Sequence, residues 1–138
     1  MKAAVSRILT GAAIACLAAP AVADGLSHLP MLEEVAPDAQ QISPHVPHMG
    51  THWANPANLE HGGPIYCVIE GRVVCVEYMF PAAAFAAGAD FTGLAPGIET
   101  PPITHIDIEY MPEGVGPMTD PLYQFHIYFA DQAVLAAH

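Results

Sequence analysis

Hydrophobic and polar residues alternate in two stretches near the end of the chain. In Ile103–Tyr110 the residues Ile106, Ile108 and Tyr110 fall on one face with Thr104, and His105, Asp107 and Glu109 fall on the other. In Tyr123–Phe129 the odd-numbered positions are aromatic or aliphatic, and His126 lies among the even-numbered ones. Because the side chains of a strand point alternately to its two faces, both stretches predict strands with one apolar and one polar face.

An earlier region is apolar almost throughout. Ile65–Ile69 and Arg72–Phe80 are rich in Val, Ile, Tyr and Cys and are separated by Glu70-Gly71, which predicts a β-hairpin. Residues 81–88 begin with Pro and end with Gly, which are start and stop signals of a short helix. Residues 131–138 predict a short terminal helix. The order β-β-α-β-β predicts a small α+β domain built on a mainly antiparallel sheet.

Two segments before the hairpin lack a sustained period. Residues 24–44 contain a glycine and three prolines and predict an extended N-terminal arm, with at most one helical turn near 31–35. Residues 45–56 read His-Val-Pro-His-Met-Gly-Thr-His-Trp-Ala-Asn-Pro, and their prolines and glycine predict a structured loop. We expect this His-rich loop to lie over one face of the sheet. The single α+β domain then spans residues 45–138.

The first 23 residues have the features of a signal peptide. Lys2 and Arg7 precede an apolar run over residues 8–19, and Ala21-Val22-Ala23 matches a signal-peptidase site. The run is shorter than the roughly 20 residues that a membrane-spanning helix needs. These features predict cleavage after Ala23, a secreted or periplasmic protein and no membrane span. Lipidation at Cys16 is an alternative with a weak sequence context.

Composition limits the possible partners. The chain has 3 Lys and Arg against 14 Asp and Glu, with 53% hydrophobic and 12% charged residues. Removing the signal peptide leaves Arg72 as the sole Lys or Arg, so the phosphate contacts that dominate nucleic-acid binding are lacking. The low charged fraction excludes acidic disorder. Histidine protonation or a bound cation is then the main counter-charge available.

Cys67 and Cys75 lie on the two arms of the predicted hairpin. If Glu70-Gly71 is a two-residue loop, Cys67 faces Val74 and Cys75 points to the opposite face. If Arg72 belongs to the loop, Cys67 faces Cys75 at a distance that a disulfide can bridge. An oxidising compartment favours the disulfide and the commonest hairpin turn opposes it. Two buried, reduced cysteines are the alternative.

The histidines and acids suggest metal chemistry. His105, Asp107 and Glu109 share one strand face, and His126 joins them if the last two strands pair antiparallel. A histidine from the loop would complete a His and carboxylate set suited to Zn, Mn or Fe, whereas Cu would suit the His-Met loop. The candidate metal ligands are His48, His52, His105, Asp107, Glu109 and His126.

A second interpretation needs no metal. The same His, Asp and Glu side chains would form a hydrogen-bonded polar network in a non-enzymatic structural or self-assembling protein. The chain has no Gly-x-Ser-x-Gly segment and no phosphate-binding glycine loop before a helix, so no catalytic residues are assigned and the sequence favours a non-enzyme. Any small-molecule ligand is unknown at this stage.

Several segments resemble a family of secreted bacterial proteins classed as a domain of unknown function. They are Val46-Pro47-His48-Met49-Gly50-Thr51-His52-Trp53, then Gly63-Pro64-Ile65-Tyr66 before a hairpin ending Glu77-Tyr78-Met79, and His105-Ile106-Asp107-Ile108-Glu109. The family's best-known member is a Thermus protein under extracytoplasmic stress-factor (sigma-E) control. The resemblance covers roughly residues 45–129, and Met-Gly-x-His-Trp is its most specific part.

The resemblance implies secretion and homo-oligomerisation, and it implies no established activity. Its signature positions correspond to Met49, Gly50, His52, Trp53, His105, Asp107, Glu109 and His126. Relatives often carry a Pro-His-aromatic-Asp-x-His-x-Tyr run in the last strand. Here Leu122 and Gln124 stand where that run has His and Asp, so only His126 is retained.

Overall fold

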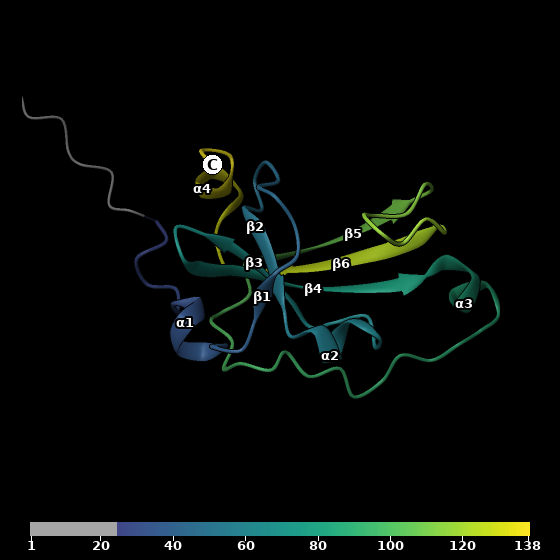
Figure 1. Cartoon of the computed structure of the whole chain (residues 1–138). Coiled ribbons are helices and arrows are strands. Elements are labelled where there is room, and N and C mark those ends of the chain that lie inside the picture. Colours follow the sequence, from purple (N-terminus) through teal and green to yellow (C-terminus); the bar gives the residue numbers. More distant parts are fainter. Residues whose placement is uncertain (1–24) are drawn as a thin grey trace, which may run out of the picture.

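The computed structural model describes residues 25–138, and the predicted signal peptide and Cys16 lie outside the described residues. The described part folds around one six-stranded, fully antiparallel sheet in the order β1-β2-β3-β4-β6-β5 (Figure 1). The strands are β1 Gln40–Gln41, β2 Thr51–Ala54, β3 Ile65–Ile69, β4 Arg72–Pro81, β5 His105–Met111 and β6 Leu122–Tyr128. Short helices accompany them: α1 Leu32–Val35, α2 Pro56–Leu59, α3 Ala82–Ala86 and α4 Gln132–Leu135. The predicted small α+β class is confirmed.

The two alternating stretches are neighbouring strands. β5 and β6 pair antiparallel with Asp107 opposite His126 and Ile108 opposite Phe125. Cross-strand partners share a face of the sheet, so the register places the histidines and acids of both strands together, as predicted. β6 also pairs with β4, where Glu77 is opposite His126.

The interpretation of residues 45–56 as a loop is wrong for Thr51–Ala54, which form β2. β2 pairs with β3 on one side and with the two-residue β1 on the other, so part of the predicted arm is also in the sheet. His52 and Ala54 are buried while Thr51 and Trp53 are half-buried. A four-residue strand is too short for this alternation to stand out beside flanking prolines, and pairing with β3 decides its conformation.

The hairpin combines features that the sequence presented as alternatives. Ile69 pairs with Arg72 around the Glu70-Gly71 turn, yet Cys67 pairs with Cys75 and the two form a disulfide with Cα atoms 5.0 Å apart. The register shifts by one residue between Cys67 and Val68, because Val68 pairs with Val73 and Val74 is the extra residue. This β-bulge lets a two-residue turn coexist with facing cysteines.

The sheet has two faces of different character. One, the site face, carries His52, Cys67, Cys75, Glu77, Gln124 and His126. The other, the aromatic face, carries Val76, Tyr78, Phe80, Phe125 and Ile127. The N-terminal arm packs into the core through the buried Leu26, Leu29 and Leu32. In residues 25–138, no helix is both long and apolar enough to cross a bilayer.

Candidate metal centre

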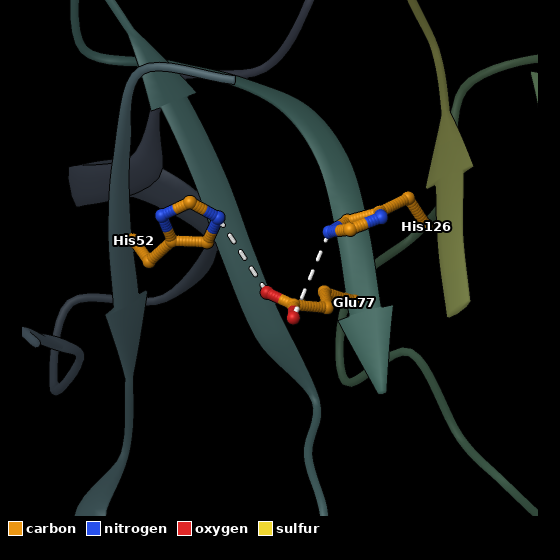
Figure 2. Close-up of side chains that lie close together, drawn as sticks. All are labelled: His52, Glu77 and His126. Carbon is orange, nitrogen blue, oxygen red and sulfur yellow. Dashed lines mark ion pairs between the residues drawn. The ribbon is translucent and has the colours of Figure 1, made fainter. Parts of the chain in front are cut away.

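Three buried polar side chains from three strands meet on the site face. His52 from β2, Glu77 from β4 and His126 from β6 each present a potential ligand atom, and these atoms all lie within 4.8 Å of one another. Figure 2 shows the two imidazoles on either side of the Glu77 carboxylate. The exposed fractions are 8% for His52, 1% for Glu77 and 0% for His126. Polar groups this deeply buried need partners, because an unpaired group costs on the order of 1–3 kcal/mol in lost hydration.

The Nε2 atoms of both histidines point at the same carboxylate. His52 Nε2 lies 3.5 Å from Glu77 Oε2, and His126 Nε2 lies 3.6 Å from Glu77 Oε1. Two ligand atoms bound about 2.1 Å from a tetrahedral metal ion are about 3.4 Å apart. Each His–Glu separation is close to that spacing and is longer than an ordinary hydrogen bond, and the whole donor set lies within 4.8 Å.

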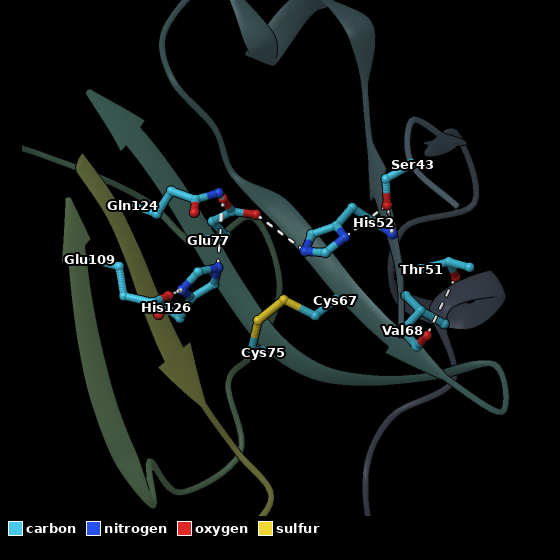
Figure 3. Close-up of a disulfide and its surroundings, with 10 residues drawn as sticks. All are labelled: Ser43, Thr51, His52, Cys67, Val68, Cys75, Glu77, Glu109, Gln124 and His126. Atoms are coloured by element: carbon cyan, nitrogen blue, oxygen red, sulfur yellow. Dashed lines mark hydrogen bonds and ion pairs between the residues drawn. A yellow bond between two sulfur atoms is a disulfide. The ribbon is translucent and has the colours of Figure 1, made fainter. Parts of the chain in front are cut away.

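Ser43 contacts the outer ring nitrogen of His52. The Ser43 hydroxyl donates to the backbone oxygen of Pro44 at 2.8 Å and accepts the His52 backbone N–H at 3.0 Å. Its oxygen also lies 2.8 Å from His52 Nδ1 (Figure 3). Since the hydroxyl hydrogen is used by Pro44, the Nδ1–H of His52 is the donor in this contact. The Nε2 lone pair is then free to face Glu77.

A carboxylate of the edge strand lies at the outer nitrogen of His126. Glu109 Oε2 on β5 lies 3.1 Å from His126 Nδ1, and the Glu109 side chain is 52% exposed. The contact is close but not aligned as a hydrogen bond, and both ring nitrogens of His126 are buried without one. A carboxylate at the outer nitrogen of an imidazole is the usual companion of a metal-bound histidine.

Gln124 orients the central carboxylate. Its Nε2 donates to Glu77 Oε1 at 2.7 Å, and Gln124 is itself buried. This bond occupies one oxygen of Glu77 and leaves Oε2 directed at His52. In this way Gln124 supports the carboxylate of the neighbouring strand.

Burial shifts the pKa values of all three groups toward their uncharged forms. It lowers the pKa of His52 to about 4, with the neighbouring His126 adding to the effect. It lowers the pKa of His126 to about 4 against the opposing charge of Asp107. Burial also raises the pKa of Glu77 to about 7, opposed by the hydrogen bond from Gln124 and reinforced by Glu109. Near neutral pH both imidazoles are therefore neutral, which is the form that binds metals.

The structure gathers part of the predicted ligand set. His52 and His126 belong to the buried group, and Glu109 contacts His126 from outside. Asp107 pairs with His126 in the register and lies outside the group. His105 stacks on Tyr128 at a ring distance of 4.4 Å. His48 lies elsewhere, with Nδ1 3.3 Å from the backbone oxygen of Leu135 near the C-terminal helix.

Glu77 is the member that sequence reasoning missed. It is the one charged residue between Val73 and Phe80, in a stretch that reads as a fully buried strand. A carboxylate at such a position is unusual, because Glu is almost never fully buried without a partner. A charged residue within a strand predicted to be buried is therefore the signal that points to Glu77. Ser43 had no comparable signal, since its role depends on the pairing of β2 with the chain before it.

The disulfide lies beside this group. Cys67 is opposite His52 across β2 and β3, and Cys75 is two residues before Glu77 on the same face of β4. Figure 3 shows the disulfide next to the side chains of His52, Glu77 and His126. Because both sulfur atoms are in the disulfide, neither is available as a thiolate ligand. The buried group therefore offers two imidazole nitrogens and a carboxylate to a metal. That donor set suits Zn²⁺, Mn²⁺ or Fe²⁺.

The comparisons with known proteins support the fold. No protein-family model matches the chain, and no curated protein is significantly similar to it. Among solved structures, the fold is similar to that of the hypothetical protein TTHB210 from Thermus thermophilus. The match has a TM-score of 0.55 and 22% sequence identity, and it covers 67% of this chain and 87% of the Thermus chain.

Proposed function

We propose that this protein is a metal-binding module whose ligands are His52 Nε2, His126 Nε2 and a Glu77 carboxylate oxygen. The observation that carries the proposal is the convergence of two imidazole Nε2 atoms on one buried carboxylate, at 3.5 and 3.6 Å. His126 adds support, because its two buried ring nitrogens make no hydrogen bond. A cation in the group would satisfy Nε2 and draw Glu77 into its charged form.

Ser43 and Glu109 complete the proposed centre as positioning residues. Each contacts the Nδ1 atom of one ligand histidine, which orients that ring and directs Nε2 inward. Three protein ligands would leave at least one coordination position for water or another small ligand. Zn²⁺, Mn²⁺ and Fe²⁺ are the metals proposed. Cu²⁺ has less support, because the His48 ring of the His-Met loop lies near Leu135, away from the group.

Elemental analysis and metal titration test this function. The chain is purified without a His tag, its bound metals are measured, and the metal-free protein is titrated with Zn²⁺, Mn²⁺ and Fe²⁺. We expect one equivalent to bind and to raise the melting temperature, as any ligand of the native state does. His126→Gln abolishes this binding, and His28→Gln at an exposed histidine serves as the matched control. Wild-type protein that binds none of the three metals contradicts the proposal.

A second candidate function is self-assembly through the edge of the sheet. The outer strand β5 exposes Ile106, Ile108 and Tyr110 to 54%, 60% and 52% on the aromatic face. A long edge strand with an apolar face is a common site of pairing between chains. On this proposal Ile108→Lys converts an oligomer into monomers in light scattering. A wild-type monomer at high micromolar concentration contradicts it.

We also infer that the protein is secreted or periplasmic and related to the family that shares the Met-Gly-x-His-Trp segment. The signal-like residues 1–23 support the location, and the fold shared with a Thermus protein is compatible with the kinship. Mass spectrometry of the chain from fractionated cells tests the location. A periplasmic or extracellular product beginning at Asp24 is expected, and an intact chain retained in the cytoplasm contradicts the inference.

A further inference from the structure

A cavity of about 600 Å³ lies on the aromatic face, on the side of the sheet away from the candidate metal centre. Its floor is formed by β4 and β6, and its walls by α3 and the connection over residues 89–103. This connection, which we call the strap, runs back from α3 along one side of the sheet to β5 (Figure 1). The volume is within the range of small-molecule sites, about 300–1,000 Å³.

Aromatic rings dominate the lining. Phe91 of the strap lies 4.1 Å from the Phe80 ring and 4.9 Å from the Phe85 ring, measured between centroids. Phe125 of β6 lies 5.7 Å from Phe80 in an edge-on arrangement. Tyr78 also lines the cavity. Aromatic rings that line a site attract cations as well as apolar groups.

The strap rests on the sheet through few directional bonds. Residues 90–103 are all described, and none of them takes part in a backbone-to-backbone hydrogen bond. Tyr66 donates its hydroxyl hydrogen to the backbone oxygen of Pro96 at 3.1 Å, and Phe91 and Ile98 pack against the core. A wall held in this way opens at low cost compared with a strand, so a ligand has a route to the cavity.

The charge of the lining selects among ligands. Asp90 is its one charged side chain, and no Lys, Arg or His of the described residues lines the cavity. Arg72, the sole Lys or Arg of the described chain, donates to the backbone oxygen of Leu29 at 2.6 Å and is not part of the lining. An anionic ligand would find no counter-charge there. A cationic ligand would find the Asp90 carboxylate and the ring faces.

We propose that this cavity binds a small amphipathic cation, an apolar molecule that carries an amine. The apolar body would lie against Phe80, Phe91 and Phe125, and the amine would lie toward Asp90. The site is independent of the metal centre, which lies on the other face. Loss of either function therefore leaves the other testable.

Calorimetric titration of the whole chain with three matched probes tests the proposal. The probes are 1-naphthylmethylamine, 1-naphthalenemethanol and the carboxylate 1-naphthaleneacetate. They share an aromatic body and are cationic, neutral and anionic, respectively. We expect the amine to bind about three- to tenfold more tightly than the alcohol, and the acetate to bind more weakly than both. Equal affinities for amine and acetate, or no binding at millimolar concentration, overturn the proposal.

Variants locate the binding. Asp90→Asn weakens amine binding about threefold and leaves the alcohol unchanged, as expected for an exposed charge pair. Glu99→Gln, on the same strap but outside the lining, is the matched control and changes neither. Thr92→Trp fills the cavity and abolishes both, with circular dichroism showing an intact fold. Probe binding that survives Thr92→Trp in the folded protein overturns the assignment.

Discussion

Glu77 and His126 are direct cross-strand partners on β4 and β6, and the His126 ring is enclosed between two carboxylates. Glu77 Oε1 lies 3.6 Å from its Nε2 and Glu109 Oε2 lies 3.1 Å from its Nδ1. A neutral imidazole has one N–H, so at most one of these nitrogens can donate to a carboxylate. The other ring nitrogen directs its lone pair at a carboxyl group. A cation between His126 Nε2 and Glu77 would stabilise this arrangement.

The central carboxylate is the first target for mutation. Glu77→Gln keeps the side-chain volume and removes the charged ligand, so we expect Zn²⁺ affinity to fall at least tenfold while the metal-free protein stays folded. Calorimetric titration measures the affinity and urea unfolding measures the stability. Glu113→Gln, at an exposed position, is the matched control. Unchanged Zn²⁺ affinity in Glu77→Gln would exclude this residue as a ligand.

The stability of the metal-free protein is expected to peak near pH 6.5. The folded-state pKa values of His52 and His126, about 4, lie below the usual 6.5, so their contribution is present above pH 6.5 and is lost as the pH falls toward 4. The folded-state pKa of Glu77 is raised from 4.5 to about 7, so its contribution is present below pH 4.5 and is lost as the pH rises through 7.

Between pH 4.5 and 6.5 the two histidines outweigh the one acid, and the stability rises with pH by on the order of 1 kcal/mol per pH unit. Urea unfolding of the metal-free protein across pH 4–8 measures this curve. In Glu77→Gln the decline above pH 6.5 should disappear, because the acid is gone. A wild-type curve that falls steadily from pH 4.5 to 6.5 would contradict the assignment of two neutral, buried histidines.

The outer partners of the histidines are expected to tune the metal affinity. Ser43→Ala removes the acceptor of the His52 Nδ1–H, and the ring loses the contact that directs Nε2 inward. Outer-partner mutations typically cost about 10- to 100-fold in metal affinity. Ser27→Ala, at an exposed serine of the same arm, should have no effect. A change in stability alone, with Zn²⁺ affinity preserved, would limit Ser43 to a structural role.

The disulfide closes a short loop around the hairpin turn. Cys67 and Cys75 are 8 residues apart, and in the chain-entropy model such a loop contributes about 2.5 kcal/mol. The Cys67→Ala/Cys75→Ala double variant should lose about this much stability in urea unfolding. The native bulge holds the same register without the bond, so metal binding should persist. Loss of binding in a folded double variant would show that the disulfide also positions the ligands.

Gly50 is expected to be essential for the entry into β2. Its φ of 74° is in the left-handed region, and a Cβ there would meet the Val68 backbone oxygen and lie 2.7 Å from Ile69 Cγ1. Gly50→Ala should therefore cost more than about 2 kcal/mol and displace His52, with loss of metal binding. Gly93→Ala is the matched control, because Gly93 has a φ of 69° and no atom within 4 Å of such a Cβ. Equal stability losses in the two variants would contradict the role of the close contact.

Part of the site could be predicted because it depends on patterns within short stretches of the chain. The alternation in 103–110 and 123–129 predicts two strands, and their pairing brings Glu109 and His126 together. The sequence predicts His52 as a metal ligand on a loop, whereas His52 lies on β2. Glu77 was not predicted, because an apolar strand with one acid does not reveal which buried partner the acid meets.

The strands with long apolar runs or clear alternation, the hairpin turn and the excess of acids over basic residues follow from the order of the amino acids. The register between the strands follows only from how they pair in the folded chain. Period-two patterns state which residues share a face of one strand, but they do not state which residues of another strand lie opposite. A one-residue bulge at Val74 brought Cys67 to Cys75, and antiparallel pairing brought Glu77 to His126. The candidate centre is made by these non-local pairings, because its ligands come from three strands that are distant in the chain.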